Sequence, residues 1–149
     1  MLKLYIGVSI IVLIPILTLY ISIKIRRDQS FVMSSIDSEL FTRNILNEFS
    51  GFIICAEKET IINKLKLLRI LSETLRKFEP CVIVDVTKDN SEWHLDVNFI
   101  QRLQINVLPC IIHIKQGSKP RELVNFMGFN TLSDQEIIRL VIKEIKKGI

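Results

Sequence analysis

The chain has 149 residues, enough for one domain and a short additional segment, and 48% of them are hydrophobic. Its formal net charge of +4 comes from the N-terminal segment, because residues 28–149 hold 16 basic and 16 acidic side chains. That balance argues against a nucleic-acid-binding protein, which needs a concentrated basic surface to displace counterions from phosphates. Three cysteines, an odd and small number, argue against a disulfide-rich secreted domain.

The first feature along the chain is an uncharged stretch of 20 residues, Leu4–Ile23. A helix of this length, at about 1.5 Å per residue, spans the ~30 Å hydrocarbon core of a bilayer. A cleaved signal peptide is the alternative, but its apolar region is shorter and ends at small residues. Here a basic segment follows, and the only alanine is Ala56. We therefore predict a membrane anchor at residues 1–27, in contact with the lipid bilayer, and one domain at residues 28–149.

Basic residues flank the predicted span unequally. Lys24, Arg26 and Arg27 follow it, whereas Lys3 alone precedes it. The positive-inside rule then predicts a single-pass membrane protein whose C-terminal domain lies on the cytoplasmic side. The three residues are interpreted as the flank of the anchor rather than as a lipid-binding cluster, since such clusters hold more charges.

In the first half of the domain, the local apolar patterns predict strands and helices in alternation. An apolar run at Phe31–Met33 predicts a short strand, and apolar residues at helical spacing predict a helix over Asp37–Phe49. Phe52–Cys55 is continuously apolar, which is typical of a strand buried on both faces. The longest helical pattern runs from Ile61 to Phe78 and stops at Pro80.

The second half continues the alternation. Cys81–Val86 predicts another core strand, and Asn90–Gln104 is a long connection that we expect to be partly helical. Cys110–Lys115 and Leu123–Met127 predict a hairpin. The last helix begins at Ser133 with an S-x-x-E capping box.

Residues 104–117 read Q-I-N-V-L-P-C-I-I-H-I-K-Q-G, and Gly128 closes the next apolar run. This pattern resembles the C-terminal half of the thioredoxin fold, where a loop ends in a proline, usually cis, that opens a strand. The resemblance covers about residues 30–147 and implies that Pro109 is this proline. It implies an α/β protein with a mixed central sheet flanked by helices, preceded here by one transmembrane helix.

In that family a C-x-x-C motif opens the long helix, where the helix N-terminus lowers the pKa of the first cysteine. Matching Ile54–Glu57 to the end of the family's central strand places the motif on Glu59–Ile62. The family's buried acidic residue falls on Ile53. Because both sulfurs and the acid are missing, the resemblance implies that ordinary dithiol activity is lost.

Two cysteines remain candidates for chemistry. Cys110 directly follows Pro109, and Cys55 ends the neighbouring strand of the implied fold. Cysteines on adjacent strands reach one another when their Cα atoms lie about 4.4–6.8 Å apart. They would form a displaced thiol pair, or Cys110 a single reactive thiol; alternatively both are small buried hydrophobic residues. The latter is favoured, because buried cysteines without a cationic neighbour are unreactive.

Neither a metal site nor a cofactor is predicted. His94 and His113 lack ligand spacing with any cysteine, and zinc needs about four ligands. His113 alternates with isoleucines and is interpreted as a packed sheet residue. The glycines are scattered, so no phosphate-binding loop is present.

The predicted partner-binding residues are Leu108 and Pro109, with Trp93 and Phe99 from the preceding connection. In thioredoxin-like domains the proline loop contacts extended partners, and aromatic side chains are common at interface hot spots. The two aromatic residues are equally consistent with packing beneath the loop.

These features predict a membrane-tethered, redox-inactive thioredoxin-like domain that acts as a protein-binding or structural module. The enzymatic alternative is an atypical thiol-disulfide oxidoreductase or isomerase that uses Cys110, with or without Cys55. A third alternative is a structural subunit of a membrane assembly, held mainly through its anchor.

Overall fold

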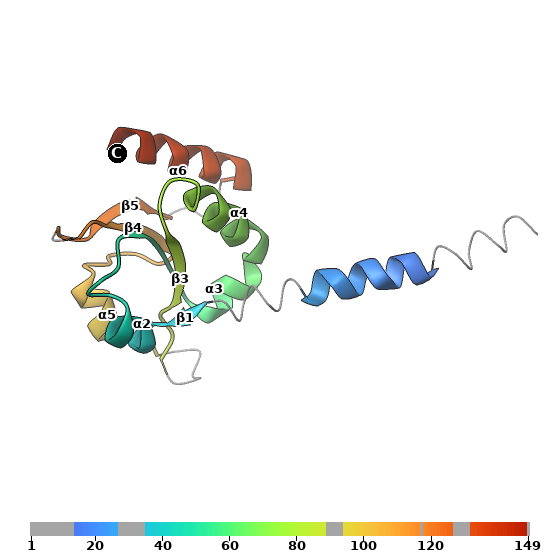
Figure 1. Cartoon of the computed structure of the whole chain (residues 1–149), viewed down its shortest axis with the longest axis horizontal. Coiled ribbons are helices and arrows are strands. Elements are labelled where there is room, and N and C mark those ends of the chain that lie inside the picture. The colour runs from blue at the N-terminus through green and yellow to red at the C-terminus, as the bar shows by residue number, and fades with distance from the viewer. Residues whose placement is uncertain (1–13, 27–34, 89–93, 117, 127–131, 149) are drawn as a thin grey trace, which may run out of the picture. The chain divides into compact units, whose positions relative to one another are not determined.

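The computed structural model describes residues 14–26, 35–88, 94–116, 118–126 and 132–148 (Figure 1). The chain divides into two compact units, Met1–Met33 and Ser34–Ile149. Within the N-terminal unit, residues 14–26 form a helix whose large apolar side chains are exposed, from 45% at Ile21 to 65% at Tyr20.

The predicted transmembrane helix at Leu4–Ile23 is wrong. No helix of the described residues is both long and apolar enough to cross a membrane. The helix at residues 14–26 covers only about 20 Å at about 1.5 Å per residue, against the ~30 Å of a hydrocarbon core. Residues 4–13 of the predicted span lie outside the described residues. The predicted single-pass localisation and cytoplasmic side depended on that span and gain no support here.

The second unit is built on one mixed sheet of five strands. Their order is β1-β3-β2-β4-β5; β1, β3 and β2 are parallel, whereas β4 and β5 are antiparallel to their neighbours. The strands are β1 (Ile36–Asp37), β2 (Gly51–Ala56), β3 (Cys81–Asp85), β4 (Cys110–Ile114) and β5 (Arg121–Asn125). The mixed sheet agrees with what the resemblance implied, and the alternation of strands and helices after β1 agrees with what the local patterns predicted.

Helices cover both faces of the sheet. Figure 1 shows α4 and α6 on one side of it and α2 and α5 on the other. The helices of this unit are α2 (Ser38–Asn44), α3 (Lys58–Asn63), α4 (Leu65–Leu75), α5 (Val97–Arg102) and α6 (Asp134–Gly148). Parallel strands require such crossovers, because a tight turn cannot join them.

The central strand β2 is buried along its whole length, which explains its continuous apolar sequence. On the α2 and α5 side, Phe41 and Phe99 pack with Ile53, Cys55 and Cys110 in one hydrophobic cluster. A second set of buried side chains comes from α4 and α6: Leu67, Leu68, Leu71, Leu75, Ile137, Val141 and Ile145.

Two predicted elements differ in detail. The helical pattern from Ile61 to Phe78 is divided at Lys64, whose φ of −110° and ψ of 25° lie outside the helical region, so that α3 and α4 are separate. The strand predicted at Phe31–Met33 lies outside the described residues. The capping box is confirmed, because the Ser133 N–H donates to the Glu136 carboxylate over 2.8 Å.

Gly51 permits the entry into β2. Its φ is +140°, and a Cβ atom at this position would lie 2.2 Å from the carbonyl oxygen of Pro80. The same oxygen accepts a hydrogen bond of 2.8 Å from the Phe52 N–H. A side chain would therefore push Pro80 away and break the alignment of β2 with β3 at this end.

Candidate functional site

The candidate site is the end of the sheet where β2 ends and β4 begins. Cys55 of β2 lies directly opposite Cys110 of β4 in the antiparallel register. The Leu108–Pro109 peptide bond immediately before β4 is cis, as the resemblance implied. Helix α3 starts at Lys58, shortly after β2 ends at Ala56. The fold thus brings together both candidate cysteines, the proline loop and the start of α3.

The paired cysteines lie in the hydrophobic core. Both are 0% exposed, and both are free thiols. Burial raises the pKa of the Cys55 thiol well above its usual value, and the hydrogen bond with Cys110 raises it further. Since the thiolate is the attacking species in disulfide exchange, this environment suppresses reactivity.

Cys81 lies outside the candidate site, at the start of β3. It is 5% exposed, and burial raises the pKa of its thiol to about 11. The nearby Ser72 side chain and the charge of Arg76 lower this pKa by less than burial raises it. Cys81 is therefore a packed core residue.

The first turns of α3 carry no thiol where the resemblance places the redox motif. Of the residues there, Ile61 is 1% exposed and part of the core, whereas Ile62 is 54% exposed. The Lys58 N–H at the start of the helix donates to the Thr87 hydroxyl over 3.0 Å. Ile53, at the position of the family's acid, is 0% exposed. This surface offers an apolar side chain instead of a nucleophile.

In the loop before β4, which contains Leu108 and Pro109, some backbone groups have no hydrogen-bond partner among the described residues. Leu108 and Pro109 are both partly buried. The Pro109 carbonyl accepts a hydrogen bond of 3.2 Å from the Phe126 N–H. Among the described residues, the N–H and C=O of Leu108 make no hydrogen bond. Backbone groups of this kind can pair with an extended segment.

Only one of the two aromatic residues predicted for partner binding, Phe99, lies among the described residues. Trp93 lies outside the described residues. Phe99 is 1% exposed and packs edge-to-face on Phe41, with ring centroids 6.3 Å apart and an interplanar angle of 79°. This placement favours the packing alternative for Phe99, and we leave it out of the binding surface.

His113 is a packed sheet residue, as interpreted from its alternation with isoleucines. It is 6% exposed, its Nε2 lies 2.8 Å from the Glu79 carboxylate, and its ring stacks on Phe52 with centroids 4.7 Å apart. His94 is exposed. Within the part of the chain that the structure describes, no group of three or more His, Cys, Asp or Glu side chains is placed to hold a metal ion.

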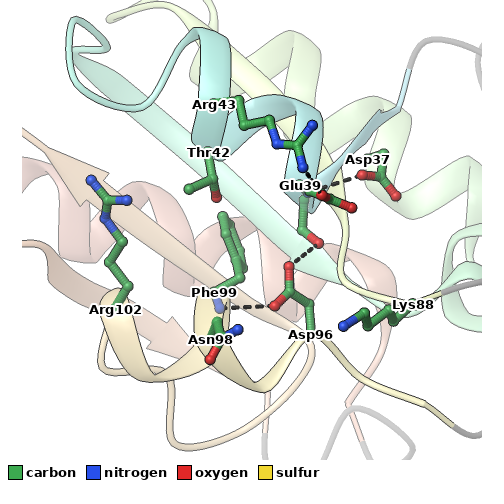
Figure 2. Close-up of a pocket in the computed structure, with 10 residues that line it drawn as sticks. Asp37, Glu39, Thr42, Arg43, Lys88, Asp96, Asn98, Phe99 and Arg102 are labelled. Carbon is green, nitrogen blue, oxygen red and sulfur yellow. Dashed lines mark hydrogen bonds and ion pairs between the residues drawn. The ribbon is translucent and has the colours of Figure 1, made fainter.

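A cavity of about 270 Å³, lined mainly by polar residues of α2 and α5, was not predicted from the sequence (Figure 2). At its centre both oxygens of Asp96 accept hydrogen bonds, one from the Ser38 hydroxyl at 2.7 Å and one from the Phe99 N–H at 3.0 Å. Because these bonds occupy the carboxylate, its role here is to hold α5 against α2. An N-cap at Asp96 can be read from sequence, but the contact with Ser38 cannot.

Comparison with protein-family models, with curated proteins and with solved structures found no match to this chain. The thioredoxin-like assignment therefore stays a prediction.

Proposed function

We propose that the unit Ser34–Ile149 is a thioredoxin-like domain without disulfide-exchange activity that binds an extended segment of a partner protein. The proposed binding surface consists of Leu108 and Pro109, which precede β4, and the exposed Ile62 of α3. Leu4–Ile23 has no part in this proposal, because no described helix could carry the membrane contact once predicted there.

The proposal rests mainly on one observation: this end of the sheet has no accessible, reactive thiol among the described residues. No cysteine occurs in α3, and the nearby pair, Cys55 and Cys110, is 0% exposed. The raised pKa of Cys55 further lowers the fraction of thiolate. A fold that has lost its reactive groups keeps its surface, and function then depends on what that surface binds.

Two features support binding rather than a purely structural role. Ile62 of α3, the helix that follows β2, exposes 54% of its surface, which is costly in water and favourable in an interface. The N–H and C=O of Leu108, which make no hydrogen bond to any described residue, can form main-chain hydrogen bonds with an extended peptide. Together they offer one apolar contact and one backbone contact.

One observation favours the enzymatic alternative, in which Cys110 acts with Cys55. Their opposed positions in the β2–β4 register place the two thiols side by side. Complete burial weighs against it, because neither a substrate disulfide nor an oxidant can reach a sulfur atom that solvent does not reach. The two proposals differ in whether the thiols react in the folded protein.

We expect no reduction of insulin disulfides above the buffer background, and binding of a subset of peptides from a panel of extended sequences. Replacement Ile62→Glu should weaken that binding at least about tenfold, because it places a charge in an apolar contact. Fluorescence polarisation of labelled peptides measures this loss.

Phe78→Glu is the matched control. Phe78 is also an exposed apolar residue, at 47%, but it follows α4 and lies away from the proline loop in sequence and fold. Equal losses in the two variants, or no peptide bound by the unmodified chain, would contradict the binding surface. Insulin reduction that disappears in Cys110→Ser and persists in Cys81→Ser would establish the enzymatic alternative instead.

A further inference from the structure

Strand β5 forms an open edge of the sheet. It pairs with β4 and with no other strand of the described sheet. The other edge, β1, consists of Ile36–Asp37 alone, too short to receive a partner strand of ordinary length. Among the described residues, nothing is hydrogen-bonded to the outward N–H and C=O groups of Arg121–Asn125. An open edge of this length is a template for another strand.

A basic rim borders this edge. It consists of four exposed side chains. Lys119 precedes β5 and Arg121 begins it, whereas Lys143 and Lys147 lie on α6, which packs against β5.

The rim carries more positive charge than its acids offset. Lys147 donates to Glu144 over 2.7 Å. The Lys147 hydrogen bond, with the charges of Lys147, Lys143 and Arg121, lowers the pKa of the Glu144 carboxyl, so three cations act on one carboxylate. Glu122 of β5 is the other nearby acid and is partly buried. The acids of the first turn of α6 lie at the opposite end of that helix.

The positive charge of the basic rim and the outward backbone groups of β5 together indicate which kind of partner could bind this edge. A second copy of the chain pairing through its own β5 would bring two basic rims together, and like charges across a strand pair are destabilising. Nucleic acid and lipid headgroups would satisfy the charges but supply no backbone N–H and C=O groups in strand register. An acidic extended polypeptide satisfies both requirements.

We propose that β5 is a docking edge for an acidic, extended segment of a partner protein, which adds a strand to the sheet beside the basic rim. The competing explanation is that the basic residues only protect the edge from aggregation, as charged residues do in many sheets. If the basic residues only protect the β5 edge from aggregation, no acidic strand should bind there.

The test uses the full chain and a synthetic peptide of about eight residues with alternating Glu and Val, a usual strand length. We expect binding by fluorescence polarisation and slower amide hydrogen exchange at Arg121–Asn125. The same peptide with N-methyl groups on alternate residues lacks backbone donors and should bind at least about tenfold more weakly. The Lys/Val peptide should not bind.

The variant Arg121→Glu/Lys143→Glu/Lys147→Glu should lose at least about tenfold in affinity, whereas Lys66→Glu/Lys77→Glu, which reverses exposed charges around α4, should bind as the unmodified chain does. Ile62→Glu should also bind normally, which separates this edge from the proline-loop surface.

Equal binding of the N-methylated peptide, unchanged exchange at β5, or no binding at all would overturn the proposal. So would a single-stranded oligonucleotide or an anionic vesicle that competes fully with the acidic peptide, or dimers through β5 in sedimentation.

Discussion

Burial is the largest influence on the pKa of Cys81. Its thiol sits at the start of β3 with 5% of its surface exposed, and burial raises its pKa from the ordinary 9.0 to about 11. The unfolded chain releases this proton more readily than the folded protein does. The folded state is therefore stabilised relative to the unfolded state while the thiol stays protonated in both.

This difference predicts an alkaline loss of stability. The contribution of Cys81 is complete below about pH 9 and is lost as the pH rises towards 11, since the unfolded state then gains free energy by ionising. A shift of this size corresponds to about 2–3 kcal/mol at most. Urea unfolding between these pH values should show a smaller loss of stability in Cys81→Ala than in the unmodified chain.

The comparison between the two proteins isolates Cys81, because lysines and the other two cysteines titrate in both. Cys81→Ala is expected to be less stable at neutral pH, where a small cavity replaces the sulfur. Parallel stability curves across the alkaline range would show that the Cys81 thiol has the same pKa in the folded and unfolded chains.

A single carboxylate joins two elements, α2 and α5. Asp96 caps α5 through the Phe99 N–H and accepts the Ser38 hydroxyl from α2, a residue that is 2% exposed. Neither helix is longer than two turns, so neither would be stable alone. Their hold on the sheet depends on this contact and on the packing of Phe41 against Phe99.

Asp96→Ala should destabilise the protein by about 1–2 kcal/mol, because it removes both an N-cap and the partner of a buried hydroxyl. Asp96→Asn keeps one of the two accepting oxygens and should lose less. Urea unfolding of Ser38→Ala, Asp96→Ala and the double variant should give a coupling of about 1 kcal/mol. Asp134→Ala, on α6, is the control expected to be additive with Ser38→Ala; additivity at Asp96 as well would contradict the contact.

At the scale of the whole molecule, the order of elements in the second unit was predictable because each is encoded by a local apolar pattern. Cys81–Val86 was predicted as a strand, and β3 covers Cys81–Asp85. The division at Lys64 carried no glycine or proline signal. The transmembrane prediction at Leu4–Ile23 rested on hydropathy alone, and no helix of the described residues is long and apolar enough to cross a membrane.

The candidate site was predictable only as far as the resemblance located it. The resemblance located Pro109 and the Cys55–Cys110 pair, since strand order fixes which residues are neighbours. Burial of Phe99 was not predictable, because an aromatic residue in a connecting segment fits a surface or a core equally well. The bond between Ser38 and Asp96 joins residues 58 positions apart, and no local pattern marks it.

The unit Ser34–Ile149 contains a complete hydrophobic core. Every buried apolar side chain of the described residues lies between Phe41 and Ile145, whereas the apolar side chains of the helix at residues 14–26 are exposed. The length of this unit is usual for one domain. Since the described residues 14–26 contain no buried side chain, we expect removal of the N-terminal unit to leave the stability of the second unit unchanged.

We therefore expect residues 34–149, expressed alone, to give a soluble protein with mixed α/β circular dichroism and a cooperative thermal melt. Its midpoint should agree with that of the full chain within about 2 °C, which is less than the shift that 1 kcal/mol produces in a domain of this size. The control is residues 50–149, which lacks β1 and α2 and with them Phe41; it should lose cooperativity, because Phe99 and Cys55 then border a void. A disordered or insoluble product from residues 34–149 under several conditions, or a much lower midpoint, would show that the N-terminal unit is needed for the fold.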